Sequence, residues 1–269
     1  MPKYRYGLKS HRLPAASLAF KLYGTLSLPS SVDLTPSMPA VYDQGELGSC
    51  TANALTAAVQ FLNKGFQGSR LFLYYNERVL SGDVSTDDGS TIADGVQSLK
   101  TQGNVAESAW PYVIANFAVK PTASLYATAL TNVVLAATNV SVNANQIKGC
   151  LANGSPVVIG IVVYSSFEST AALSSGIVPM PAASDTVLGG HAIVLVGYND
   201  STNLFKFRNS WGTSYGVQGY GYLPYAYVTD ANLASDLWEI TSVSPPPTPP
   251  TPAPSPIPAS YTTCTCAIA

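Results

Sequence analysis

The pattern of apolar residues changes near the middle of this 269-residue chain, and that change constrains its fold more than any other feature. Residues 50–62, 71–80 and 92–99 repeat apolar side chains at the spacing of amphipathic helices. From residue 133 on, short runs rich in β-branched and aromatic residues are typical of strands. Helices followed by strands predict an α+β fold in which the two kinds of element form separate lobes.

The second half is expected to form a mostly antiparallel lobe. Its predicted strands span residues 133–142, 156–163, 192–198, 204–209, 219–223 and 237–243, with one helix at 145–153. Pro111 and Tyr112 follow the helical half and are predicted to mark the crossing between the lobes. Cys150 lies in the interrupting helix, at a spacing from Ile147 that predicts an inert core cysteine.

The best candidate for chemistry is Cys50, which follows a loop containing Gly45 and Gly48 and opens the first predicted helix. Ser49 stands at the N-cap position, so the thiol is expected in the first turn. There the positive end of the helix dipole favours thiolate over thiol. Six residues earlier, Gln44 offers an amide donor. Together with the Cys50 backbone N–H it predicts a two-donor oxyanion hole.

Cleavage of an amide also needs a proton for the leaving amine, and the chain has only two histidines. His11 lies in a polar N-terminal stretch and is predicted to be exposed and without a role. His191 follows a double glycine and is predicted at the mouth of an apolar strand. Asn209, eighteen residues later, is a neutral group able to accept a hydrogen bond from the imidazole. Trp211 is large enough to shield that bond from water.

Four motifs in this order resemble the papain-like cysteine peptidases. They are Asp-Gln-Gly with Gly-Ser-Cys up to Cys50, Gly-His-Ala around His191, Asn-Ser-Trp-Gly from Asn209, and Gly-Tyr-Gly-Tyr from Gly219. The 141 residues between Cys50 and His191 fall within the roughly 130–150 found in papain and cathepsins. The resemblance covers about residues 29–243 and implies a papain-like two-lobe fold with the active-site cleft between the lobes. It implies no cofactor and no metal.

The resemblance implies an endopeptidase that attacks a peptide carbonyl with Cys50, uses His191 as acid and base, and orients the ring with Asn209. Two alternatives stay open: a peptide ligase or transpeptidase using the same acyl-enzyme, and a catalytically silent papain-fold interaction protein. The polypeptide substrate is expected to contact Gly89, Ser90, Gly190 and Ala192. For the loop at residues 85–91, an ordinary turn with Asp88 or Thr91 as helix cap is the alternative.

The chain departs from the family pattern beside the nucleophile. Familiar members read Cys-Gly-Ser-Cys-Trp, whereas this chain has Leu47 and Thr51 at the first and last of those positions. Leu47 removes a disulfide partner, and Thr51 removes an aromatic side chain behind the nucleophile. Neither change touches the chemistry of Cys50, and together they predict a compact, disulfide-poor branch of the family.

Composition divides the chain into a leader at residues 1–28, the family-like domain at 29–243 and a tail at 244–269. The leader has five basic and no acidic residues, so it is either a solvated extension or a short inhibitory segment that docks across an acidic cleft. Nine prolines in residues 244–258 predict a semi-rigid polyproline II spacer. Beyond them, Cys264 and Cys266 supply two thiols, an incomplete metal site; an intermolecular disulfide or no role are the alternatives.

Charge and cysteine usage exclude several other classes. The net charge of −2 gives no reason to expect a nucleic-acid partner. The chain has no apolar run long enough for a membrane span, and its N-terminus lacks the apolar core of a signal peptide. Four cysteines do not form a secreted disulfide framework, so a reducing, cytoplasmic compartment is favoured. We expect a monomer.

Overall fold

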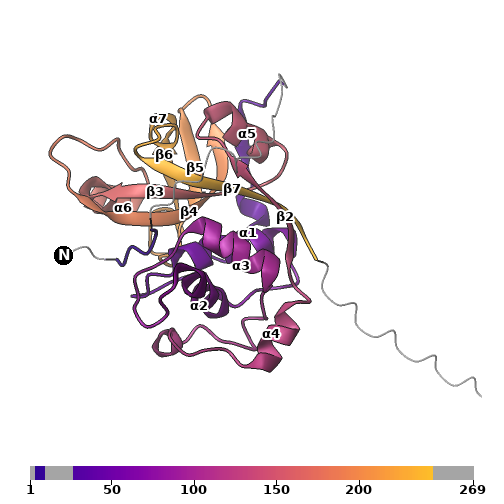
Figure 1. The fold of residues 1–269 in the computed structure, drawn as a ribbon. Helices are drawn as coiled ribbons and strands as arrows, with labels where there is room; N and C mark the ends of the chain where they lie inside the picture. The colour runs from indigo at the N-terminus through magenta and orange to yellow at the C-terminus, as the bar shows by residue number, and fades with distance from the viewer. Residues whose placement is uncertain (1–3, 10–26, 245–269) are drawn as a thin grey trace, which may run out of the picture.

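The computed structural model describes residues 4–9 and 27–244, which form a helical lobe and a sheet lobe (Figure 1). The helical lobe holds α1 Cys50–Leu62, α2 Arg70–Ser81, α3 Ile92–Thr101 and α4 Ala123–Ala129. In the sheet lobe every strand pairing is antiparallel. The predicted α+β architecture is therefore confirmed.

Helices α2 and α3 begin at residues whose side chains cap them. Ser69 precedes α2, and its hydroxyl accepts a hydrogen bond from the Phe72 N–H. The helix ends at Gly82, whose φ of +86° is a left-handed conformation that glycine adopts without steric cost. Thr91 caps α3 by accepting from the Asp94 N–H, which confirms the cap predicted for this loop.

The sheet orders its strands β2-β7-β3-β4-β5-β6, and β1 pairs with β4. The strands are β1 Ser31–Asp33, β2 Val134–Val140, β3 Val157–Tyr164, β4 Val187–Asn199, β5 Leu204–Arg208, β6 Tyr220–Pro224 and β7 Ala234–Val243. The remaining elements are the helices α5 Ala144–Ala152, α6 Thr170–Ser175 and α7 Tyr225–Val228, and the 3-10 turns η2 Thr35–Ser37, η3 Ile114–Asn116 and η4 Ser165–Glu168.

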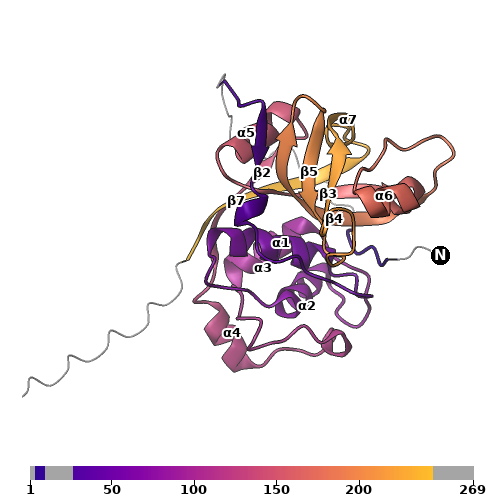
Figure 2. The ribbon, with the colours of Figure 1, turned by 180° about the vertical axis from the view of Figure 1, so that it is seen from behind.

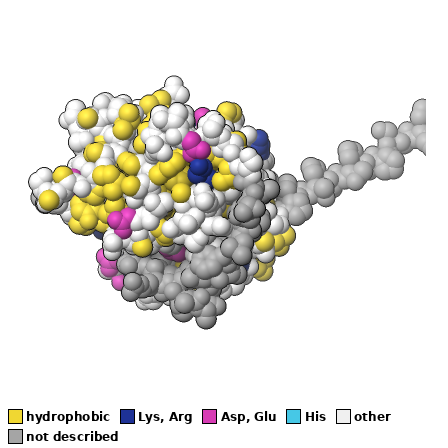
Figure 3. Space-filling model, turned by 90° about the horizontal axis from the view of Figure 1, so that it is seen from above, with side chains coloured by type: hydrophobic (Ala, Val, Ile, Leu, Met, Phe, Trp, Pro, Cys, Tyr) yellow, Lys and Arg dark blue, Asp and Glu magenta, His cyan; other side chains and the backbone are white. Residues whose placement is uncertain are grey.

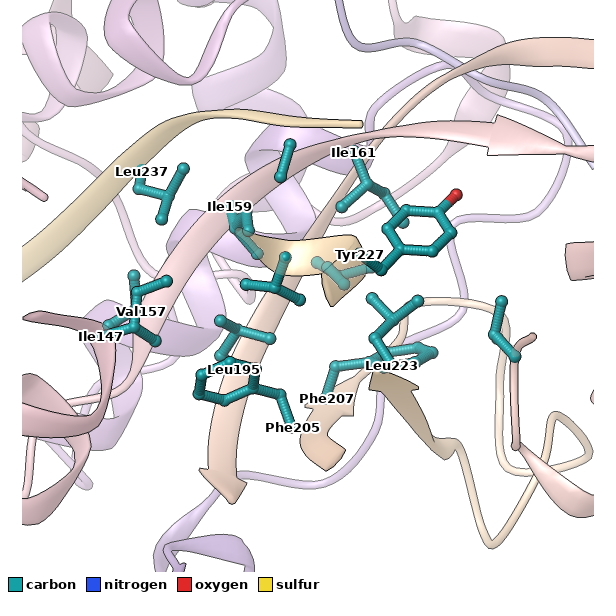
Figure 4. Packing of buried hydrophobic residues seen from close by; sticks show 14 of the residues in the cluster. Ile147, Val157, Ile159, Ile161, Leu195, Phe205, Phe207, Leu223, Tyr227 and Leu237 are labelled. Carbon is teal, nitrogen blue, oxygen red and sulfur yellow. The ribbon is translucent and has the colours of Figure 1, made fainter. Parts of the chain in front are cut away.

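Strand β3 is buried on both faces, which explains why it is a continuous apolar run in the sequence. Because successive side chains of a strand point to opposite faces, β3 serves two cores. Val157, Ile159 and Ile161 join the cluster on the face of the sheet that α5 covers (Figure 4). Val158 joins the cluster between the sheet and α1, which lies directly beneath the strands in Figure 2. Cys150 packs in the first cluster and is only 1% exposed, as predicted for a core residue.

The predicted crossing at Pro111 and Tyr112 is wrong. The chain forms α4 after these residues, and α4 packs on the helical lobe through Leu125, Tyr126 and Ala129. The chain therefore reaches the sheet only at β2. Pro111 sits in the loop after α3 instead, where its missing N–H breaks no ladder or helix.

Strand β4 begins at Val187, five residues before the predicted start. Gly189 and Gly190 pair with Val163 and Val162 of β3. His191 therefore lies inside a strand rather than at its mouth. The double glycine misled the prediction because glycine is common at strand ends. Here the two glycines instead leave room for Tyr6 and Leu8, which approach the strand closely.

Few charged side chains lie on the face of the molecule shown in Figure 3, in keeping with the low charged fraction of 10%. His11, Cys264, Cys266 and most of the proline-rich tail lie outside the described residues, and the predictions for them stay predictions.

Candidate active site

Cys50 is the first residue of α1 and is fully buried. Ser49 holds the N-cap position, as expected, but its hydroxyl makes no capping bond. That hydroxyl instead meets the Tyr112 hydroxyl and accepts from the Asn53 amide. The start of the helix is thus fixed by side chains of the helical lobe, and the thiol stands at the positive end of the helix dipole.

His191 and Asn209 are brought together by the neighbouring strands β4 and β5. The His191 Nε2 lies 2.8 Å from the Asn209 Oδ1, and both side chains are buried. An amide oxygen only accepts, so Nε2 carries the proton and Nδ1 is the acceptor of the ring. Trp211 stacks on the imidazole at 4.8 Å between centroids and covers the bond, as the sequence predicted.

Gln44 lies beside these residues because residues 42–44 run next to 210–212. Its backbone N–H donates to the Ser210 carbonyl, and the Ser210 hydroxyl donates to the Gln44 Oε1 at 2.6 Å. This fixes the amide so that Nε2 faces the Leu47 carbonyl at 3.0 Å and the Arg5 carbonyl at 3.3 Å. Ser210 is a supporting residue that the sequence analysis missed, although it lies within the Asn-Ser-Trp-Gly motif.

The N-terminal segment, residues 4–9, lies between the two lobes and covers the candidate site (Figure 1). Ser90 donates its N–H to the Gly7 carbonyl at 2.8 Å and accepts from the Lys9 N–H at 2.8 Å. Leu8 donates to the Gly190 carbonyl at 3.0 Å. Two of the four residues expected to contact substrate, Ser90 and Gly190, thus hydrogen-bond an extended piece of this chain.

The other two expected contact residues also line the segment. A side chain at Gly89 would overlap the Gly7 backbone, because a Cβ there would stand 1.7 Å from the Gly7 carbonyl oxygen. The Ala192 backbone N–H points at the Cys50 sulfur. At the far end of the segment, Tyr4 stacks on Trp211 at 3.8 Å.

Burial decides the charge state of the two reactive groups. Exclusion of water raises the pKa of the Cys50 thiol to about 11, and the N–H groups of Ala192 and Gly7 only partly offset it. Burial lowers the pKa of His191 to about 4, against the opposing effect of Asn209. Burial thus works against the thiolate that the helix dipole favours, and it shifts the pKa values of both groups toward their neutral forms in this covered arrangement.

The Cys50 sulfur and the His191 ring make no direct hydrogen bond in this structure. The backbone N–H groups of Ala192, which follows His191, and of Gly7 face the sulfur instead. The His191 Nδ1 has no hydrogen-bond partner among the described residues, so it does not accept from the thiol here. A thiol at a helix start, an imidazole held by an amide oxygen and a fixed carboxamide donor are the groups expected of a hydrolase with a cysteine nucleophile.

Comparison with known proteins gives the family. A profile of the papain family cysteine proteases matches residues 28–237. The crystal structure of xylellain, a cysteine protease from Xylella fastidiosa, superposes with a TM-score of 0.84 at 38% identity, covering 88% of this chain and 96% of that one. An uncharacterized peptidase C1-like protein, L477 of Acanthamoeba polyphaga mimivirus, is 37% identical over 89% of this chain and 81% of its own length. The chain therefore belongs to the papain family of cysteine peptidases.

More distant relatives agree on the fold. The cysteine endopeptidase Rep1 of rice is 27% identical over 80% of this chain, which spans 57% of the length of Rep1. A digestive procathepsin L 3 from Tenebrio molitor larval midgut shares the fold with a TM-score of 0.65 at 21% identity, over 88% of this chain and 76% of that one. The protein is thus a peptidase with the papain-like two-lobe fold.

In residues 4–9 and 27–244, no helix is long and apolar enough to cross a membrane. The same residues contain no group of three or more His, Cys, Asp or Glu side chains able to hold a metal ion.

Proposed function

We propose that this peptidase is an endopeptidase that cleaves through a thioester on Cys50, with His191 as general acid and base, and that residues 4–9 inhibit it. The observation that carries the proposal is the bond between His191 Nε2 and Asn209 Oδ1. It commits Nε2 as a donor and leaves Nδ1 as the only proton acceptor of the ring.

The reaction follows from these groups. Nδ1 of His191 takes the thiol proton as the Cys50 sulfur attacks the peptide carbonyl. The oxygen that becomes negative accepts hydrogen bonds from the Gln44 Nε2 and the Cys50 N–H. His191 then returns the proton to the amine nitrogen as the C–N bond breaks, leaving a thioester. Water attacks the thioester while Nδ1 accepts its proton, and the acid product leaves with the thiol restored.

Inhibition by the N-terminal segment is supported by where its atoms lie. The Arg5 carbonyl occupies the Gln44 Nε2 donor that the reaction needs. The Gly7 N–H faces the Cys50 sulfur, which is the atom that must attack. A substrate carbonyl can reach neither group until the segment leaves. The segment also contributes to the burial that keeps Cys50 and His191 neutral.

The segment can dock in this position only because residue 7 is a glycine and has no side chain. A Cβ on Gly7 would stand 1.7 Å from the Gly48 carbonyl oxygen, a distance that no side-chain rotation relieves because the obstacle is backbone. Substitution of Gly7 by alanine therefore expels the segment and leaves the active site of the full chain open.

The test measures hydrolysis of fluorescent casein by the full-length protein and by Gly7→Ala, with Cys50→Ala placed in both. We expect Gly7→Ala to release internal casein fragments, detected by mass spectrometry, and its label by the epoxide inhibitor E-64 to map to Cys50. Cys50→Ala should remove both activity and label in either background. Hydrolysis that survives Cys50→Ala would overturn the assignment of the nucleophile. Release of single terminal residues alone would exclude an endopeptidase.

A further inference from the structure

Asp87 is a carboxylate built into the wall of the active site. It lies in the loop between α2 and α3, and its side chain is 12% exposed. Its two oxygens accept from the Gly48 N–H at 3.0 and 3.1 Å, and one of them accepts from the Tyr74 hydroxyl. Gly48 is two residues before Cys50. These bonds hold the loop that carries the nucleophile where Leu47 leaves no disulfide to do so.

The cation that pairs with Asp87 comes from the N-terminal segment. The Arg5 Nε lies 2.7 Å from the Asp87 Oδ2, and an Arg5 terminal nitrogen donates to the Asp87 backbone carbonyl at 2.9 Å. The backbone carbonyl of the same Arg5 lies at the Gln44 Nε2. One residue thus places its carbonyl at the oxyanion donor and its side chain on Asp87.

That juxtaposition identifies which substrate residue Asp87 meets. The residue whose carbonyl lies at the oxyanion donor is the one that becomes acylated onto the sulfur. Arg5 therefore shows that a residue with its carbonyl at this donor can bring a basic side chain to Asp87, although in the segment itself it is Gly7 that faces the sulfur. Arg5 is the only cation that forms an ion pair with Asp87 among the described residues. When the segment leaves, this largely covered carboxylate loses its counter-charge.

We propose that Asp87 makes this peptidase selective for a basic residue, arginine before lysine, on the acyl side of the scissile bond; the inference rests on the proposed endopeptidase function. Arginine is preferred because its Nε and terminal N–H groups reach the carboxylate and the carbonyl of Asp87 together, whereas a lysine ammonium is a single point charge. Citrulline has the shape of arginine without the charge. A charge-assisted hydrogen bond of this kind corresponds to a preference of roughly 10- to 100-fold.

The neighbouring acids do not compete for this role. Asp88 is exposed, and its carboxylate accepts only from the Thr86 hydroxyl. Asp83 is used within its own turn, where it accepts from Ser85 and Thr86. Asp88 therefore offers a matched control, because its removal takes one negative charge from the same loop without touching the segment.

The experiment compares three fluorogenic substrates that differ only at the acyl residue: acetyl-leucyl-arginine, -lysine and -citrulline coumarin amides. The enzyme is full-length Gly7→Ala, alone and with Asp87→Asn or Asp88→Asn. We expect kcat/KM to fall from arginine to lysine to citrulline in Gly7→Ala and in Asp88→Asn. In Asp87→Asn the arginine-to-citrulline ratio should approach one, since asparagine keeps an oxygen acceptor for Gly48 but no charge.

The outcomes separate this inference from the proposed function. The ratio of two substrates on one enzyme preparation is independent of the fraction that is folded, so partial misfolding of Asp87→Asn does not blur it. Equal rates on arginine and citrulline by Gly7→Ala itself would overturn the inference while leaving the peptidase in place. An arginine preference that survives Asp87→Asn would also overturn it. Failure of Gly7→Ala to cleave casein and all three substrates would instead count against the proposed function.

Discussion

The sharpest consequence of the structure is that a methyl group on Gly7 should activate the enzyme. Alanine at this position adds one carbon, and that carbon would lie 1.7 Å from the Gly48 carbonyl oxygen and 2.7 Å from its Cα. Both atoms belong to the loop that carries Cys50, so neither moves without displacing the nucleophile. The segment must therefore leave its site, and the full chain shifts from a covered to an open state.

The size of the activation follows from the contacts that the segment gives up. Three backbone hydrogen bonds tie it down: two to Ser90 and one to Gly190. Each is worth about 1 kcal/mol; the Arg5–Asp87 ion pair and the stacking of Tyr4 on Trp211 add to them, and the entropy lost on fixing the segment offsets most of the sum. A net preference of about 1.4–2.8 kcal/mol for the covered state corresponds to roughly 10- to 100-fold. We expect kcat/KM to rise by that factor in Gly7→Ala, with KM improving because substrate no longer competes with the segment.

The assay is initial-rate hydrolysis of a fluorogenic peptide at several substrate concentrations. Gly65→Ala is the matched control, since its Cβ would meet nothing closer than the Asn63 side chain at 3.9 Å. It should behave as the unaltered chain. Deletion of residues 1–9 should give the same rate as Gly7→Ala and no more. Unchanged activity in a Gly7→Ala protein that melts normally would refute the inhibitory role of the segment.

Other predictions test the chemistry. In the Gly7→Ala background, Gln44→Ala should lower kcat by about 10²–10³ because one oxyanion donor is lost. Ser210→Ala should lower kcat less, because it only frees the Gln44 amide to rotate. Stopped assays at saturating substrate measure both effects. In the unaltered chain, alkylation of Cys50 by iodoacetamide should be slow at neutral pH and rise about tenfold per pH unit toward pH 11, because thiolate forms only as pH approaches the raised pKa. In Gly7→Ala the pH profile of alkylation should move to lower pH. Coincident profiles for the two proteins would contradict the role of burial. Cys150→Ala should keep full activity and full E-64 labelling, with loss of stability by about 1 kcal/mol in urea melts, because Cys150 acts as a small core side chain.

The candidate reactive residues could be proposed from the sequence because each is recognisable from its immediate neighbours. Cys50 follows a glycine-containing loop at the start of a periodic helix, and Asn209 lies in a short motif with Trp211. Such local patterns do not depend on how distant segments pack. The prediction of helices failed where the apolar periodicity is weak. Helix α4 has only seven residues, and only one of them is buried. Without a periodic apolar face, its place in the helical lobe was not predictable.

The contacts of residues 4–9 were beyond sequence reasoning for a different reason. A basic leader without acids is as typical of a solvated extension as of an inhibitor, and the sequence analysis left both open. What distinguishes them is contact across the fold: Arg5 meets Asp87, 82 residues away, and Leu8 meets Gly190. Those pairings exist only once both lobes are assembled, so no local pattern encodes them.

The contacts of residues 4–9 both cover the active site and affect the protonation states of Cys50 and His191. The segment that blocks the Gln44 donor also excludes water from the Cys50 thiol and the His191 ring. Desolvation penalises the charged forms of both groups, so the covered enzyme holds the pair neutral as well as hidden. Departure of the segment admits solvent, which lowers the pKa of the thiol and raises that of the imidazole, and both changes favour proton transfer from sulfur to nitrogen. If the segment inhibits as proposed, the covered enzyme is protected twice against alkylation and misplaced hydrolysis, and a single displacement removes both barriers.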